Sequence, residues 1–206
     1  VIDNEALFNI SQKILKQKSP NFADLNWLIS LVMGGCTASL RFPGLLNCDL
    51  RKMSVNLVPF PRLHFFTSAY SPLISQGHEW NNTKWDLNRI SDNVWNPRNL
   101  LTSIRKKGDD GKFLSASVHY RGRDISSAEI ENITQKYLNS EHEQFVEWIP
   151  HNVKTSIITL KPQNVDTTAT MVGNITSVKD CFERIWESFN KLFEKKAFLH
   201  WYKGEG

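Results

Sequence analysis

The sequence is poor in cysteine, and the few cysteines it has form no pattern. Cys36, Cys48 and Cys181 are an odd number and widely spaced, and none stands at metal-ligand spacing from another. Reduced thiols in a cytosolic protein are the simplest interpretation. The six histidines share no helical face at ligand spacing either, so the sequence predicts no metal site.

Long apolar runs and concentrated positive charge are also missing. No apolar run approaches the roughly 20 residues that a membrane-spanning helix requires, so no membrane segment is predicted. The net charge is only +4, and the Lys and Arg residues do not form a stripe interleaved with aromatic side chains. Nucleic-acid binding is therefore not expected. With 40% hydrophobic and 22% charged residues, the composition is that of an ordinary soluble globular protein.

The usual catalytic signatures are absent. The sequence contains no Gly-x-x-x-x-Gly-Lys-Ser/Thr loop, no Gly-x-Gly-x-x-Gly, no His-Glu-x-x-His and no Gly-x-Ser-x-Gly. Residue chemistry alone therefore predicts a soluble α/β domain and leaves its function open.

Hydrophobic periodicity is present, and it predicts several helices. Asp3 is placed as the N-cap of a first helix, which Pro20 would end. A second helix is expected from about Asp24 to Leu40, and its apolar residues on more than one face indicate a buried helix. The Gly34-Gly35 pair would let a neighbour approach it closely. Further helices are expected after residue 49, over 126–138 and, most clearly, from Val178 to Phe193.

Four segments have the composition of strands. The segment 112–120 alternates Ser and aromatic residues with Leu, Ala and Val, which predicts a strand buried on one face. The other predicted strands cover 62–70, 156–160 and 168–172. Strands separated by helices and long loops indicate a mixed sheet flanked by helices, an α/β (α+β) fold.

Five stretches closely resemble consecutive parts of β-tubulin, in family order and near family spacing. The resemblance extends essentially from Val1 to Gly206. The stretches are Leu40-Arg-Phe-Pro-Gly44, Asn47-Cys-Asp-Leu-Arg-Lys52, Val58-Pro-Phe-Pro-Arg-Leu-His-Phe-Phe66, Phe145-Val-Glu-Trp-Ile-Pro-His-Asn-Val-Lys154 and Lys196-Ala-Phe-Leu-His-Trp-Tyr-Lys-Gly-Glu-Gly206.

The resemblance implies an architecture and a guanine site. Residues 1–42 would be the end of a GTP-binding domain and its long central helix, 43–174 a tubulin/FtsZ-like intermediate domain, and 175–206 the first helix of a C-terminal domain. In the family two Asn amides and an aromatic ring hold guanine, and the matching positions are Asn4, Asn26 and Phe22. An amide offers a donor and an acceptor to the guanine edge. Phe22 replaces the usual Tyr, so stacking survives without the hydroxyl.

The resemblance also implies a surface that reaches the nucleotide of a neighbouring subunit. The matching residues are Asn47, Asp49, Arg51 and Lys52. In α-tubulin a Glu in this helix is thought to position the attacking water, whereas here the position holds Lys52. A Lys can neutralise phosphate charge but is a poor base at neutral pH. The surface should therefore dock on the partner's GTP without promoting its hydrolysis. The alternatives are a turn residue at Asn4, a helix-entry residue at Asn26 and a solvated Lys52.

The implied function is that of a β-tubulin-like microtubule constituent in the cytoplasm and cytoskeleton. It would pair with α-tubulin and would bind GTP/GDP as part of a full-length parent, whose Mg²⁺ site would lie upstream. Because the Gly-rich phosphate loop is not in these residues, the chain alone should not hydrolyse GTP.

Departures from the family keep a second hypothesis open. The segment 78–93 replaces the lateral-contact loop, and Trp27 and Ile74 stand at the drug-binding surface where His and Thr are common. These changes put lateral bonding and taxane-type binding in doubt. The alternative is a non-polymerising tubulin fragment that binds or caps α-tubulin. An autonomous GTPase is disfavoured by the missing phosphate loop.

Overall fold

A four-stranded mixed sheet organises the chain. The computed structural model describes residues 1–43, 49–75, 85–103, 111–140, 144–162 and 165–205. The strand order is β1-β4-β2-β3, with β2 and β3 parallel and the other neighbours antiparallel. The strands are β1 (Thr67–Ser71), β2 (Phe113–Gly122), β3 (Val153–Ile158) and β4 (Thr167–Ile175). The predicted mixed sheet flanked by helices is confirmed.

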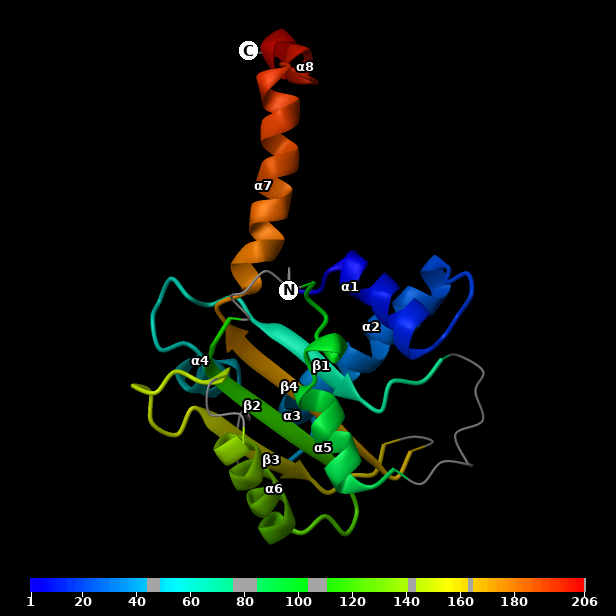
Figure 1. Cartoon of the computed structure of the whole chain (residues 1–206), viewed down its shortest axis with the longest axis vertical. Helices are drawn as coiled ribbons and strands as arrows, with labels where there is room; N and C mark the ends of the chain where they lie inside the picture. Colours follow the sequence, from blue (N-terminus) through cyan, green and yellow to red (C-terminus); the bar gives the residue numbers. More distant parts are fainter. Residues whose placement is uncertain (44–48, 76–84, 104–110, 141–143, 163–164, 206) are drawn as a thin grey trace.

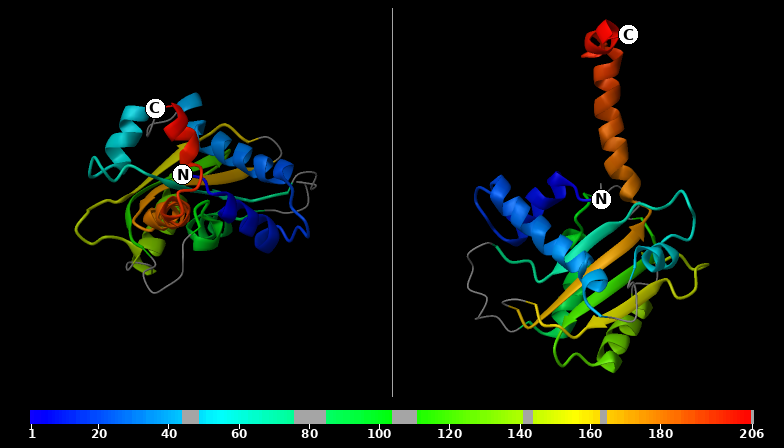
Figure 2. Two further views of the ribbon diagram at one scale, coloured as in Figure 1. Left: turned by 90° about the horizontal axis from the view of Figure 1, so that it is seen from above. Right: turned by 180° about the vertical axis from the view of Figure 1, so that it is seen from behind.

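Helices cover both faces of the sheet. α2 and α4 lie on one face, and α5 and α6 lie on the other (Figures 1 and 2). The helices are α1 (Asn4–Asn9), α2 (Phe22–Cys36), α3 (Ala38–Arg41), α4 (Leu50–Leu57), α5 (Leu87–Trp95), α6 (Ser127–Ser140), α7 (Val178–Glu194) and α8 (Leu199–Glu205). A π-helical turn covers Ile10–Ile14 and a 3-10 turn covers Pro97–Asn99. No helix in these described ranges is long and apolar enough to cross a membrane.

The strand β2 is buried on both faces, so the prediction of a half-buried strand was wrong. Its alternating serines pointed to a solvated face, but α4 packs on one face of β2 and the cluster that includes Trp95 and Ile130 packs on the other. The serines satisfy their hydroxyl groups internally. Ser115 Oγ, for example, donates to the Leu57 carbonyl oxygen at 2.7 Å. Small polar side chains with internal hydrogen bonds can be buried at little cost.

Two apolar clusters fill the layers. The larger one combines sheet residues with α5 and α6, and Trp95 is at its aromatic centre, stacked on Tyr137 at 4.6 Å. The smaller one joins α1 and α2 through Leu7, Ile10, Leu25 and Leu28. The second cluster is what fixes α1 against α2.

The helix α2 departs from its prediction in two ways. It begins at Phe22 behind an Asn21–Asp24 capping box and ends at Cys36, with the short α3 following Thr37. It is also not buried on all sides, because Phe22 is 78% exposed. The close approach expected at the glycine pair is found at Gly35 alone. A Cβ built on Gly35 would lie 2.2 Å from Thr170 Oγ1, whereas a Cβ on Gly34 would meet no atom within 4 Å.

These neighbouring glycines give a matched pair of variants. Gly35→Ala should lower the free energy of unfolding by about 1–3 kcal/mol, because α2 must move away from β4. Gly34→Ala should raise it by about 0.5–1 kcal/mol through the better helix propensity of Ala. Urea denaturation of both variants measures the difference. Equal effects of the two substitutions would show that α2 does not pack on Thr170.

The helix α7 extends away from the body of the chain (Figure 1). Its first turns are held, because Val178 and Cys181 are buried and Arg184 forms ion pairs with Asp3 and Glu5. The Arg184–Asp3 hydrogen bond, together with the charge of both carboxylates, raises the pKa of the guanidinium further above its usual range. Beyond these turns the apolar face predicted for this helix is exposed, including Trp186 and Phe189.

Candidate functional site

The first candidate site lies on the helix pair α1 and α2. Asp3 caps α1 by accepting from the Glu5 amide at 3.3 Å, and Asn21 caps α2 by accepting from the Asp24 amide at 3.0 Å. The apolar faces of α1 and α2 are turned toward each other. Asn4 and Asn26 are therefore left exposed, as is Phe22 at the first position of α2.

The three side chains are available for binding. Within the described part of the chain, the Asn4 and Asn26 amides make no hydrogen bond and the Phe22 ring makes no ring contact. Two free amides and an uncovered aromatic ring on one helix pair offer hydrogen bonds and a stacking face. That combination suits a flat heterocycle.

The second candidate site is a surface centred on α4. Asp49 caps this helix by accepting from the Lys52 amide at 2.7 Å, and the side chains of Arg51 and Lys52 are exposed. Asn47 lies outside the described residues, so its place in this surface stays a prediction. On the same helix the apolar Leu50 and Val55 are 69% and 77% exposed.

An exposed aromatic pair extends this surface. Phe60 lies three residues after the end of α4 and is 44% exposed. Its ring lies 5.7 Å from that of Trp148, which is 62% exposed. We name the exposed side chains of Leu50, Arg51, Lys52, Val55, Phe60 and Trp148 the α4 surface. Exposed apolar groups beside exposed cations are typical of a protein interface.

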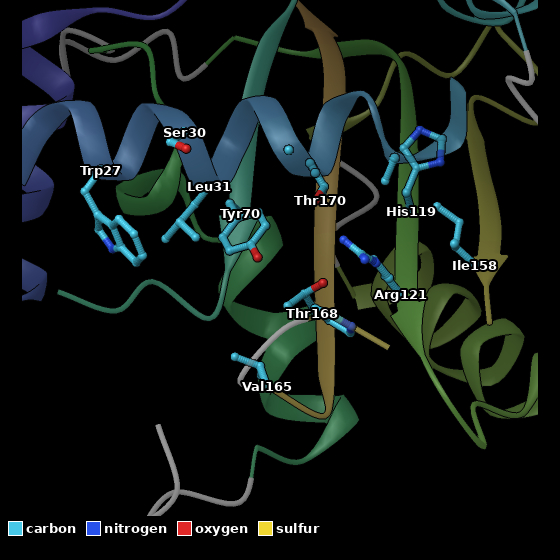
Figure 3. Close-up of a pocket in the computed structure, with 14 residues that line it drawn as sticks. Trp27, Ser30, Leu31, Tyr70, His119, Arg121, Ile158, Val165, Thr168 and Thr170 are labelled. Atoms are coloured by element: carbon cyan, nitrogen blue, oxygen red, sulfur yellow. The ribbon is translucent and has the colours of Figure 1, made fainter. Parts of the chain in front are cut away.

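A cavity of about 200 Å³ lies between α2 and the sheet (Figure 3). Its polar lining includes Arg121, Tyr70, Thr168 and Thr170, and Trp27 lines it from α2. The indole Nε1 of Trp27 donates to the Ile74 carbonyl oxygen at 3.1 Å, so the two residues predicted at the drug-binding surface contact each other. The cavity is smaller than the roughly 300–1,000 Å³ of most small-molecule sites, and by itself it identifies no ligand.

His119 is a buried titratable group beside this cavity. Its Nδ1 lies 2.6 Å from Ser156 Oγ and its Nε2 lies 3.3 Å from Ser117 Oγ. Burial away from water lowers the pKa of His119 to about 4. The imidazole is therefore neutral at physiological pH and acts as a hydrogen-bonding core residue.

Comparison with known proteins decides the family. The family described as the Tubulin C-terminal domain matches residues 61–187. The chain belongs to the tubulin family. The tubulin beta chain of the Guillardia theta nucleomorph is 44% identical to it, over 100% of this chain and 46% of that protein. The tubulin beta-6 chain of Gossypium hirsutum and the tubulin beta chain of Cicer arietinum are each 43% identical, over 100% of this chain and 45% of theirs.

These relatives confirm the resemblance to β-tubulin. The tubulin chain spans a little less than half of their length. The family match covers the whole sheet and the start of α7, and it includes Phe60's partner Trp148.

Sequence reasoning missed Phe60 and Trp148 as parts of a binding surface. Both residues stand inside stretches that resemble β-tubulin, but the two stretches are far apart along this tubulin chain. The usable signal was at Phe60, a large aromatic residue between Pro59 and Pro61, where no strand or helix period would bury it. The partnership between the two rings depends on the fold.

Proposed function

We propose that this tubulin chain carries the partner-contacting and guanine-contacting parts of a β-tubulin-like microtubule constituent. The α4 surface supports the proposal most strongly, because it combines exposed apolar groups with Arg51 and Lys52. Such a surface suits the nucleotide-bearing end of an α-tubulin subunit, where the cations would meet phosphate charge. The proposal includes a division of the chain into three domain parts, with boundaries at 42/43 and 174/175. It also includes a place in the cytoplasmic microtubule cytoskeleton.

The docking direction follows from the charges. Asp49 is engaged as the cap of α4, which leaves Arg51 and Lys52 as the charged groups that this helix presents. Neither cation forms an ion pair within the described part of the chain. Lys52 would sit near the partner's phosphates as a charge without acting as a base.

Guanine recognition belongs to the same proposal. Asn4, Phe22 and Asn26 would hold the base of GTP or GDP when the chain is joined to a phosphate-binding domain. Exposed amides and an exposed ring on two packed helices support this assignment.

Asn26→Ala tests the assignment. In a tubulin-length chain that includes a phosphate-binding domain, the variant should weaken GTP binding by about 1–3 kcal/mol, because a polar contact to the base is lost. Titration with a fluorescent GTP analogue measures it. Asn132→Ala on α6 is the control, since that Asn is exposed on the opposite face of the sheet. Equal affinities of the two variants would remove Asn26 from the guanine site.

A second function, capping of α-tubulin without polymerisation, is favoured by the altered 78–93 segment. Residues 76–84 lie outside the described ranges, and α5 begins at Leu87. Co-assembly with purified tubulin separates the two functions. A lattice constituent should co-sediment with microtubules in proportion to polymer mass. A cap should instead lower polymer mass while remaining bound at filament ends, and absence from both fractions would contradict both functions.

A further inference from the structure

The helix α4 is weakly anchored for an element that presents a binding surface. It has eight residues, and only Leu57 at its C-terminal end is buried. Its neighbours in the chain are residues 44–48, which lie outside the described ranges, and the Pro-rich segment 58–61. Hydrogen bonds from the sheet reach α4 at this buried C-terminal end.

Two buried side chains bind this end. Ser115 Oγ donates to the Leu57 carbonyl oxygen at 2.7 Å, and Asn174 Nδ2 donates to the same oxygen at 3.0 Å. The last carbonyl groups of a helix have no partner within the helix, so a buried one needs donors from elsewhere. The sheet supplies two donors to this one acceptor.

Asn174 also binds the far end of the segment that follows α4. Its Nδ2 donates to the Leu63 carbonyl oxygen at 2.6 Å. Both hydrogens of the amide are thus used, one at Leu57 and one at Leu63. The segment between these residues carries Phe60, so one side chain holds both ends of the loop that sets the Phe60 ring against Trp148.

The sheet is shaped around this contact. Ser115 on β2 and Asn174 on β4 are direct partners in the register, and both are at most 4% exposed. A register shift occurs in β2 between Phe113 and Ser115, immediately before the pair. Bulges of this kind redirect side chains next to functional surfaces.

We propose that Asn174, supported by Ser115, is a positioning residue for the α4 surface. Its amide holds α4 and the Phe60 loop in the geometry that sets Phe60 against Trp148 and directs Lys52 toward the partner. The inference rests on the proposed docking function and adds the residue that arranges its surface. A purely structural Asn174 would contribute to global stability alone.

Asn99 provides the control for that alternative. It is buried, at 7% exposure, and its Nδ2 also donates to a backbone carbonyl oxygen, that of Asn93 at 2.6 Å. It lies in the 3-10 turn Pro97–Asn99 that follows α5, and α5 is on the opposite face of the sheet from α4 (Figures 1 and 2). Asn99→Asp and Asn174→Asp make the same chemical change, since each removes amide donors at constant size and places an oxygen against a carbonyl.

Hydrogen exchange on the full chain is the first readout. The Val58 amide donates to Ser54 O and the Leu63 amide to Phe60 O, so both report on the loop ends. Asn174→Asp should speed exchange at Val58 and Leu63 by about tenfold or more, the factor that matches loss of a buried hydrogen bond. Asn99→Asp should leave these two rates near those of the wild-type chain. Equal rates in the two variants would overturn the inference.

Binding to purified α/β-tubulin is the second readout, with each variant compared at the same folded fraction. Asn174→Asp should bind about tenfold more weakly than Asn99→Asp. If Asn174→Asp fails to fold, Ser115→Ala takes its place in this test. It removes one of the two donors to the Leu57 carbonyl and should weaken binding by a smaller factor. If the wild-type chain binds tubulin, but Asn174→Asp and Ser115→Ala bind it no more weakly than Asn99→Asp, the positioning role alone is overturned. A wild-type chain that binds no tubulin contradicts docking, and the positioning role with it.

Discussion

Lowering the pH from about 6.5 to 4 is expected to reduce the free energy of unfolding by about 3 kcal/mol through His119 alone. Burial lowers the folded-state pKa of His119 to about 4, while the unfolded chain has the ordinary value near 6.5. Within this window the unfolded state binds a proton that the folded state does not. Stability therefore falls as the pH falls, and the loss levels off below pH 4.

His119→Gln tests this expectation, because Gln keeps a polar side chain between Ser117 and Ser156 but does not titrate. Urea denaturation at pH 7, 6, 5 and 4 should show a shallower pH dependence in the variant than in the wild-type chain. Parallel pH profiles for the two proteins would show that folding does not lower the pKa of His119. Carboxylates titrate in both proteins, so the comparison isolates the imidazole.

Trp148→Ala should weaken binding to α/β-tubulin by about 2–4 kcal/mol, a loss typical of a central aromatic residue in an interface. The reason is the position of Trp148 beside Phe60 on the α4 surface, where docking would remove both rings from water. Loss of this contact affects mainly dissociation, so surface plasmon resonance should show a faster off-rate.

Trp186→Ala is the matched control for Trp148→Ala. Trp186 on α7 is 61% exposed and Trp148 is 62% exposed, so both substitutions remove the same amount of exposed ring. Trp186→Ala should change tubulin affinity little if docking uses the α4 surface. Equal losses for the two variants would place the interface elsewhere.

Local patterns in the sequence predicted the helices well because their signals are local. Asp3 and Asp49 cap α1 and α4, and the three-four spacing of apolar residues from Val178 predicted α7. The boundary of α2 was less accurate, since the capping box at Asn21 begins it earlier and Thr37 interrupts the helical pattern. The first strand was predicted from Arg62, yet β1 begins at Thr67, because pairing with β4 starts there.

Contacts between distant segments could not be predicted in this way. His119 resembled an isolated filler residue, and its buried partner Ser156 depends on the parallel register of β2 and β3. The pairing of Phe60 with Trp148 and the two bonds of Asn174 likewise need the folded sheet. The family resemblance supplied the candidate roles of six residues, and the structure added that their side chains are exposed. These residues are Asn4, Phe22, Asn26, Asp49, Arg51 and Lys52.

The hydrolysis rate of GTP bound to α-tubulin tests the docking geometry most directly. Lys52→Glu places a carboxylate where docking would bring it to the partner's nucleotide, and a carboxylate can orient an attacking water. Docking at the α4 surface predicts that this variant speeds hydrolysis relative to the wild-type chain, whereas Lys136→Glu on α6 does not. An unchanged rate with bound Lys52→Glu would contradict the placement of α4 at the partner's nucleotide.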